Sequence, residues 1–475
     1  TQTSKQLTTH RATDNQPVWV GDDIFFTSDR DYTLNLFRYV EGADPVAVTH
    51  HDAFDVLWPS AGPGAIGYER GGFLHRFDPA SGQSVQLDIE VRGDRPGLMP
   101  RFVDAGKFIE SGDLSPDGKR AVFGARGEVF SVPAENGQVR NVSRSAGSRE
   151  ISVSWSPDGQ QVAWLGDASG EYELYVAAQD GSGEARRLTH DGDVWRFPPV
   201  WSPDSKKLAF GDKKQRLQYV DVESGKVTQA DHSDRNDITA YRWSPDSRYL
   251  AYVKNDDANV GNIWLYSLAN GSTEQLTSSD TQDADPVFDP EGRYLYFVSN
   301  RDFNMQFGDR DNAVIYADSG RVYAGLLRAD VPALHRPRSD EVSLEDEAKE
   351  ENGEEEEKEP LRIETAGFEQ RVTAVNKDGG NYRSLAANSK GVFFISDGEG
   401  GGNLHFFDLD SEEQKTVLSD IDDYVLAGRG EKIMFRKNGK FGIADAQPDQ
   451  VATEGLLDLS GMQLRIDPSV EWRQM

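Results

Sequence analysis

Short apolar segments recur along this chain, and many of them follow the same tight polar turn. The turn reads Ser-Pro-Asp followed by Gly or Ser, and it begins at Ser115, Ser156, Ser202 and Ser244, with a variant at Asp289. Successive copies are 41, 46, 42 and 45 residues apart. Proline at the second turn position fixes φ at about −65°, and the Asp with the following Gly or Ser completes a hairpin turn. The motif therefore predicts a hairpin at the same point of a repeated β unit.

Each repeat contains four apolar segments of strand length. The segment before the turn ends in an aromatic residue, as at Trp155, Trp201 and Trp243. Second strands are expected at 161–164, 207–210 and 249–252, third strands at 173–176, 217–220 and 263–266, and fourth strands at 186–189 and 274–277. Four antiparallel strands per period make one blade of a β-propeller. The tryptophans recur too regularly for a ligand site, so we expect them in the core between blades.

The spacing predicts how the repeats divide into domains. Degenerate copies at Asn388 and Gly428 complete a series that spans residues 108–450, which predicts an all-β fold with a seven-bladed propeller. Two further units, around Gly21 and Gly62, precede it. Propellers usually have about four to eight blades, so residues 1–90 are expected to be the last two blades of an incomplete N-terminal propeller. A linker at 91–107 and a tail at 451–475 complete the predicted organisation.

The fifth unit is longer than the others. Asp289 and Asn388 are 99 residues apart, which predicts an insertion at about 303–362. Its core, 341–359, is acidic and contains no aromatic residue, so it cannot bury enough apolar surface to offset the entropy of ordering. We expect a solvated tether there, in preference to a bait for basic peptides or a weak Ca²⁺ binder.

The charge and composition exclude several functions. The net charge of −30, of which the segment 339–359 carries twelve acids against two lysines, argues against a nucleic-acid partner. There are no cysteines, and no apolar run approaches the roughly 20 residues that span a bilayer, so we expect no disulfide, no thiolate metal site and no membrane span. A cytoplasmic and a periplasmic location both remain open.

No catalytic pattern is visible in the chain. The eight histidines include no HExxH pair, and there is no Gly-x-Ser-x-Gly elbow and no Walker loop. The cluster His50-His51-Asp52 is interpreted as a surface loop in preference to a metal site. The acidic run at 408–413 starts like a calcium loop but lacks the glycine at its sixth position, so a hairpin turn is favoured. We therefore expect no catalytic residue, no metal and no cofactor in this chain.

Several segments resemble the tricorn-type serine proteases. They are Gly93-Asp94-Arg95-Pro96, the blade that contains Arg126-Gly127-Glu128, the run from Gly367 to Val372, Gly380-Asn381-Tyr382, and the end from Asp467 to Met475. The resemblance implies a six-bladed propeller, a seven-bladed propeller, and then mixed α/β catalytic domains that flank a PDZ module. On that layout residues 1–90 end the six-bladed ring. The catalytic serine and histidine would lie outside this chain, which would be inactive alone.

The resemblance also implies that the seven-bladed channel guides peptides to a downstream active site. Residues near the channel mouth should precede the turns, and the candidates are Arg149, Glu150, Arg196, Phe197, Tyr241, Arg242, Asp283 and Asp285. For each of them, a hydrogen bond to a neighbouring blade is the alternative role. The expected partners are peptides or unfolded polypeptide, the protease's own PDZ and catalytic domains, and further copies of the full-length protein.

Two other functions stay open at this stage. One is a TolB-like propeller that acts as a protein-binding scaffold. The other is a propeller enzyme that acts on glycans or uses a metal, which would need carboxylates clustered at the channel mouth. Only the tricorn-type assignment accounts for both ends of the chain.

Overall fold

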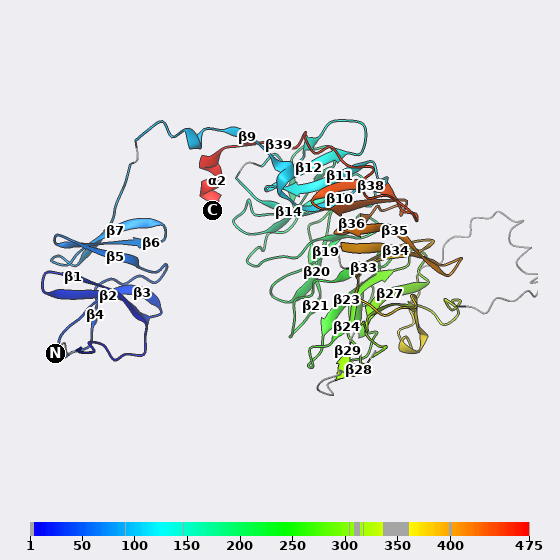
Figure 1. Cartoon of the computed structure of the whole chain (residues 1–475), viewed down its shortest axis with the longest axis horizontal. Helices are drawn as coiled ribbons and strands as arrows, with labels where there is room; N and C mark the ends of the chain where they lie inside the picture. The colour runs from blue at the N-terminus through cyan, green and yellow to red at the C-terminus, as the bar shows by residue number, and fades with distance from the viewer. Residues whose placement is uncertain are drawn as a thin grey trace, which may run out of the picture. The chain divides into compact units, whose positions relative to one another are not determined.

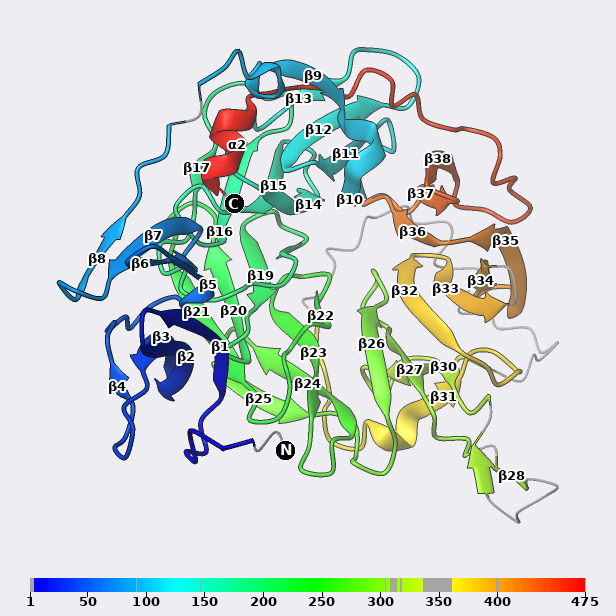
Figure 2. The same ribbon diagram turned by 60° about the vertical axis from the view of Figure 1, so that its left-hand side comes forward.

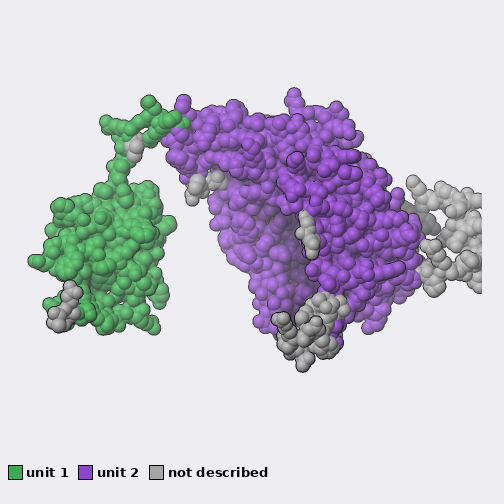
Figure 3. Space-filling view, viewed as in Figure 1, with its two compact units in different colours: residues 1–96 green, residues 97–475 purple. Residues whose placement is uncertain are grey.

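The computed structural model describes residues 4–90, 92–145, 147–303, 305–307, 314–316, 318–335, 361–398 and 401–474. The chain divides into two compact units, Thr1–Pro96 and Gly97–Met475, which Figure 3 shows in different colours. Regular structure in both units is almost entirely antiparallel β-sheet (Figure 1). No helix within the described ranges is long and apolar enough to cross a membrane. The predicted all-β class is confirmed.

Unit 1 contains two four-stranded sheets, each ordered as its strands occur in the sequence. The strands are β1 (Asp14–Val20), β2 (Asp23–Asp31), β3 (Thr33–Arg38) and β4 (Val46–Ala47), then β5 (Leu57–Gly62), β6 (Ala65–Arg70), β7 (Phe73–Asp78) and β8 (Gln83–Gln86). One buried apolar cluster, which includes Phe25, Leu36, Ile66 and Phe77, joins the two sheets. Each sheet therefore buries one face against the other.

Most of unit 2 consists of sheets with the same simple strand order. The first four are β10 (Ile109–Leu114), β11 (Arg120–Ala125), β12 (Glu128–Pro133) and β13 (Arg140–Asn141); β14 (Glu150–Trp155), β15 (Gln161–Gly166), β16 (Glu173–Ala178) and β17 (Arg186–Arg187); β18 (Val200–Trp201), β19 (Lys207–Gly211), β20 (Arg216–Asp221) and β21 (Val227–His232); and β22 (Tyr241–Trp243), β23 (Tyr249–Asn255), β24 (Gly261–Ser267) and β25 (Ser272–Gln275).

The later sheets of unit 2 have the same strand order, but one of them is interrupted in the sequence and the last has three strands. They are β26 (Asp283–Phe288), β27 (Tyr294–Ser299), β30 (Arg321–Leu326) and β31 (Val372–Ala374); β32 (Tyr382–Asn388), β33 (Gly391–Gly398), β34 (Gly401–Asp408) and β35 (Glu413–Ile421); and β36 (Asp423–Leu426), β37 (Lys432–Lys437) and β38 (Lys440–Asp445). A small hairpin, β28 (Met305–Phe307) and β29 (Val314–Tyr316), lies between β27 and β30 in the sequence. The predicted acidic core at 341–359 lies outside the described residues.

The repeated polar turn connects the first and second strands of a sheet, as predicted. In the turn between β14 and β15, the Ser156 hydroxyl donates to Asp158 Oδ1 at 2.6 Å, and the same oxygen accepts from the Gln160 N–H at 2.9 Å. The Ser156 N–H donates to the carbonyl of Gln161 at 2.9 Å. The side chains thus satisfy backbone groups that a tight turn leaves unpaired.

The tryptophans that precede these turns lie between sheets, which confirms the predicted core. Trp155, Trp201 and Trp243 are 6–7% exposed. The Trp201 indole N–H donates to the carbonyl of Ser154 in the preceding sheet at 3.4 Å, and Trp243 donates in the same way to Val200 at 3.0 Å. The Trp155 indole N–H donates instead to the carbonyl of Gly159 in its own turn at 3.2 Å. Trp201 and Trp243 therefore combine the burial of a large apolar surface with one hydrogen bond between neighbouring sheets.

The first strand of each sheet in unit 2 lies beside the first strand of the next. Contacts run from β10 to β14, β18, β22, β26, β32 and β36, and β36 contacts β10 again. Figure 2 shows these sheets spread around a common centre. At the junction of the last and first sheets, Ala427 and Met434 share a buried cluster with Leu114 and Phe123. Apolar burial between neighbouring sheets thus continues around the whole circle.

The segments assigned to the linker and the tail pair with each other. β9 (Arg101–Asp104) and β39 (Gln463–Ile466) form a two-stranded antiparallel sheet. The short 3₁₀ turns η1 (Pro96–Leu98) and η2 (Ala105–Phe108) flank β9, and η3 (Glu369–Arg371) precedes β31. Helix α2 (Pro468–Gln474) follows β39, and its Glu471 carboxylate contacts the Arg126 guanidinium at 3.1 Å. Residues far apart in the sequence are therefore held together.

Candidate functional site

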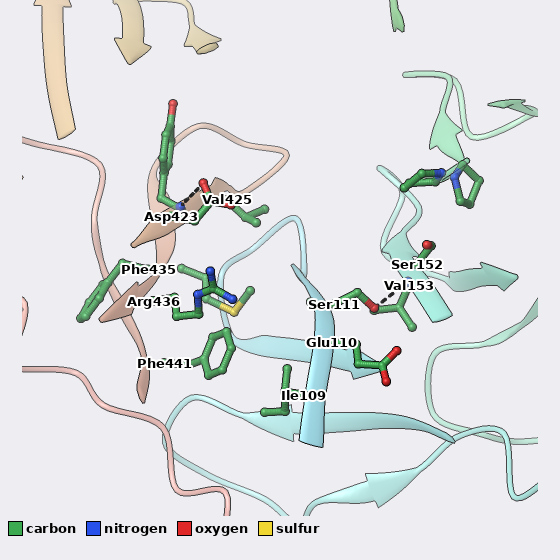
Figure 4. A pocket seen from close by; sticks show the side chains of 15 residues that line it. Ile109, Glu110, Ser111, Ser152, Val153, Asp423, Val425, Phe435, Arg436 and Phe441 are labelled. Atoms are coloured by element: carbon green, nitrogen blue, oxygen red, sulfur yellow. Dashed lines mark hydrogen bonds between the residues drawn. The ribbon is translucent and has the colours of Figure 1, made fainter. Parts of the chain in front are cut away.

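A pocket of about 380 Å³ opens where the first strands of unit 2 converge (Figure 4). Its lining comes from the first, second, third and last sheets. The lining residues are Ile109, Glu110, Ser111, Gly112, Ser152, Val153, Pro198, Pro199, Asp423, Tyr424, Val425, Met434, Phe435, Arg436 and Phe441. The walls thus combine aliphatic and aromatic side chains with hydroxyl, carboxylate and guanidinium groups.

Bulges interrupt three of the first strands at small polar residues, one of which lines this pocket. The strand register shifts at Ser152, Asp285 and Ser384, and these residues have φ of 55°, 51° and 55°. Residues other than glycine rarely adopt this left-handed conformation, so packing must hold it in place. Ser152 lines the pocket, and Asp285 Oδ2 accepts from the Leu385 N–H of the next sheet at 2.7 Å.

Three of the predicted channel residues form ion pairs between neighbouring sheets. The Arg149 guanidinium lies 2.7 Å from the carboxylate of Glu110, which lines the pocket. Arg242 lies 4.0 Å from Asp285. The side chains of Arg149, Glu110 and Arg242 are 45%, 46% and 41% exposed. These side chains are accessible to a ligand.

Four other predicted residues are buried, beginning with Glu150 and Arg196. Glu150 accepts hydrogen bonds from Ser148 at 2.6 Å and Ser143 at 3.2 Å, and burial raises the pKa of its carboxyl to about 7. The Arg196 side chain is 1% exposed and lies 3.1 Å from Glu173 and 2.6 Å from Asp191. Both side chains therefore have polar partners within the fold.

Tyr241 and Asp283 are the other two buried residues. The Tyr241 hydroxyl donates to the carbonyl of Pro198 in the preceding sheet at 2.6 Å, and burial raises its pKa. Asp283 lies 3.3 Å from Arg301, and burial raises the pKa of its carboxyl. Phe197 is partly exposed, and its ring lies 5.2 Å from the Lys213 ammonium. None of these three lines the described pocket.

Sequence reasoning missed several residues of the pocket and its rim. Glu110, Ser111 and Asp423 line the pocket, and Arg383 lies 3.9 Å from Asp423. Asp423 and Arg383 belong to the degenerate repeats, in which the Ser-Pro-Asp turn is absent. Counting back from the apolar second strand, instead of from the turn, would have identified the first strands that carry them.

The histidine cluster is partly internal to unit 1. His50 is exposed, whereas His51 is half-buried and its Nε2 lies 3.1 Å from the Tyr68 hydroxyl. The Tyr68 and His75 rings stack with their centroids 5.2 Å apart, and burial lowers the pKa of both histidines. Among the described residues, no group of three or more His, Cys, Asp or Glu side chains could hold a metal ion.

The repeated four-stranded sheets and their continuous circle of contacts define a β-propeller protein. A comparison with known families gives the same class and refines it. The model of the tricorn protease second beta propeller domain matches residues 109–447, and the chain belongs to the tricorn protease family.

Individual relatives agree with this assignment. Tricorn protease homolog 1 of Streptomyces coelicolor is 25% identical over 97% of this chain and 46% of its own length. A putative tricorn-like protease C-terminal subunit of Sulfurisphaera tokodaii is 26% identical over 97% of this chain and 53% of its own length. The crystal structure of the tricorn protease superposes with a TM-score of 0.71 at 19% identity, over 99% of this chain and 46% of that one. The chain thus spans about half the length of these relatives.

Proposed function

We propose that this chain is the substrate-guiding propeller region of a tricorn-type protease. In this proposal the sheets from β10 to β38 form one seven-bladed propeller, and the two sheets of unit 1 are the last blades of a six-bladed one. The pocket at the centre of unit 2 belongs to a channel through which extended polypeptide passes toward catalytic domains elsewhere in the protease. The match to the second propeller domain of the family carries the proposal.

The lining of the pocket suits an extended peptide. Hydroxyl and carboxylate groups at Ser111, Ser152 and Asp423 can bind backbone amides, and the Phe441 and Val425 side chains offer apolar contact. Backbone recognition is independent of sequence, because every residue except proline carries the same donor and acceptor. Such a site binds many peptides and holds each of them weakly.

A substitution that narrows the channel tests this proposal. Pro198 is exposed and lines the pocket, and the hydrogen bond that it accepts from the Tyr241 hydroxyl goes to its backbone carbonyl, which the substitution keeps. Pro198→Trp should weaken binding of an unstructured, fluorescently labelled peptide by about tenfold in an anisotropy titration, because the indole occupies the peptide's path.

The chain offers a matched control for that variant. Pro332 is also exposed, its carbonyl also accepts from a tyrosine hydroxyl, that of Tyr294 at 3.0 Å, and it does not line the described pocket. Pro332→Trp should leave peptide affinity unchanged. Equal affinities for the wild type and both variants would refute the channel as the peptide site. Cleavage of the peptide by the chain alone would refute a purely guiding role.

The TolB-like scaffold is supported less well. The TolB homolog of Chlorobium chlorochromatii is 29% identical, but over 41% of this chain only. The tricorn relatives extend over 97% of it, including both units. We therefore favour the protease assignment.

A further inference from the structure

The first strands of unit 2 carry two kinds of charged side chain. Asp113, Glu150 and Asp283 are held by backbone or hydroxyl donors, as in the 2.7 Å bond from the Trp155 N–H to Asp113 Oδ2. Desolvation raises the pKa of the Asp113 carboxyl to about 6. These three carboxyl groups already have hydrogen-bond partners within the fold. The remaining charges are accessible, and they form pairs.

Three cross-sheet ion pairs account for the accessible charges. They are Glu110 with Arg149 at 2.7 Å, Arg242 with Asp285 at 4.0 Å, and Arg383 with Asp423 at 3.9 Å. Each pair joins the first strand of one sheet to the next sheet in the circle, and all the side chains are between 25% and 53% exposed. We call this set the ion-pair ring. It contains equal numbers of cations and anions, although the whole chain carries −30.

The charged residues next to the ion-pair ring include both signs, so they do not give the channel a charge of one sign only. Arg436, on β37, lines the pocket and lies 3.7 Å from Asp422. Arg383 also contacts Asp397 of its own sheet at 2.9 Å. The charges of the more distant surface are screened over about 8 Å at physiological ionic strength. Glu110 and Asp423 of the ring line the described pocket, so a peptide bound there meets these carboxylates together with their partners Arg149 and Arg383.

We propose that the ion-pair ring makes the channel indifferent to the charge of the polypeptide that it binds. This inference rests on the proposed function, and it names the substrate class: extended polypeptides that are acidic, basic or uncharged. An exposed ion pair stabilises a protein by only about 0–1 kcal/mol, so a charged guest side chain can replace either partner at small cost. A lysine of the guest meets Glu110, Asp285 or Asp423, and a glutamate meets Arg149, Arg242 or Arg383.

Two triple variants test the ring by removing one sign at a time. The base-neutralised variant combines Arg149→Gln, Arg242→Gln and Arg383→Gln, and the acid-neutralised variant combines Glu110→Gln, Asp285→Asn and Asp423→Asn. The control neutralises a pair of similar exposure on the second and third strands, Lys432 with Asp445, whose side chains are 43% and 48% exposed. Circular dichroism melting shows that each variant is folded before binding is measured.

The probes are three labelled peptides of equal length, one rich in Lys, one rich in Glu and one uncharged. Anisotropy titrations at about 0.15 M salt should give wild-type affinities that agree within about threefold. The base-neutralised variant should favour the Lys-rich over the Glu-rich peptide by about tenfold, and the acid-neutralised variant should show the opposite preference. The control should behave as the wild type does.

The outcomes separate the two proposals. A wild-type preference for one charge that both triple variants retain would overturn the ion-pair ring, even if Pro198→Trp still weakens all three peptides. A Pro198→Trp variant that binds every peptide as the wild type does would overturn the channel itself, and with it the ring.

Discussion

The carboxyl group of Glu150 is buried at the first position of β14, where two serine hydroxyls donate to it. Its folded pKa is raised from 4.5 to about 7 because burial disfavours the charged form. The folded state therefore holds this proton more tightly than the unfolded state does. The resulting stability is complete below pH 4.5 and is lost as the pH rises through about 7.

Glu150→Gln removes this pH dependence, because an amide does not titrate. Between pH 5 and pH 8 the unfolding free energy of the variant should rise relative to the wild type by about 2 kcal/mol. Chemical denaturation at both pH values measures the difference. The exposed Glu413 supplies the control, since Glu413→Gln should change little. A wild type that gains stability over this pH range relative to the variant would contradict the assignment.

At the residue scale, the sequence predicted which aromatic side chains would be buried. It did not predict which charged side chains would be exposed. Trp201 and Trp243 were identified from their regular position before the turn. Arg196 and Arg242 occupy similar positions in the sequence, yet one side chain is 1% exposed and the other 41%. Only the neighbouring sheet decides this, because Glu173 and Asp191 surround Arg196.

At the element scale, the turns with Ser in place of Gly gain a contact between sheets. The Ser205 hydroxyl accepts from the Asp158 N–H of the preceding turn at 3.0 Å, and Ser247 accepts from the Asp204 N–H in the same way at 3.0 Å. Both serines have positive φ, 58° and 61°, where glycine would be free of strain. The hydrogen bond compensates for the strained backbone.

Substitutions at Ser205 separate these two effects. Ser205→Ala loses the hydrogen bond and keeps the strain, so it should destabilise unit 2 by about 1 kcal/mol. Ser205→Gly loses the bond but also relieves the strain, so the net change should be within about 0.5 kcal/mol. Denaturant midpoints of the two variants and the wild type give the comparison. Alanine as stable as the wild type at this position would show that the hydrogen bond contributes nothing, and alanine as stable as glycine would show that the left-handed backbone carries no strain.

The turn chemistry of these elements was readable from the sequence, whereas the bulges were not. Pro and Asp act locally, so the hairpin between β14 and β15 follows from a few residues. The left-handed conformation of Ser152 in β14 arises where the first strand shifts register against the second. The sequence around Ser152 gives no sign of that shift, because packing against the adjacent sheet imposes it.

At the scale of the whole molecule, the paired ends of unit 2 reinforce its first sheet. Leu464 and Ile466 of β39 belong to the same buried cluster as Ala121 and Phe123 of β11. Ile466 is 3% exposed. The tail therefore covers apolar surface on the sheet at which the circle of contacts begins and ends.

Ile466→Ala should cost about 2–4 kcal/mol, because it removes buried methylene groups and leaves a cavity. Hydrogen exchange should quicken first in β9, β10 and β11, where the tail packs. Leu456→Ala is the control, since that side chain is 40% exposed and should have a small effect. Unchanged protection of β9 in the Ile466 variant would show that the pairing of the two ends does not stabilise the unit.

The sequence by itself determined the all-β class, the repeat, the turn in each repeat and the aromatic core between sheets. These features follow from local chemistry and a regular period, which one chain displays directly. The tertiary structure alone decided which strands meet at the centre, which carboxylates are buried, and how 101–104 pairs with 463–466. Such relations depend on residues brought together from distant repeats, and each repeat is completed only by its neighbours.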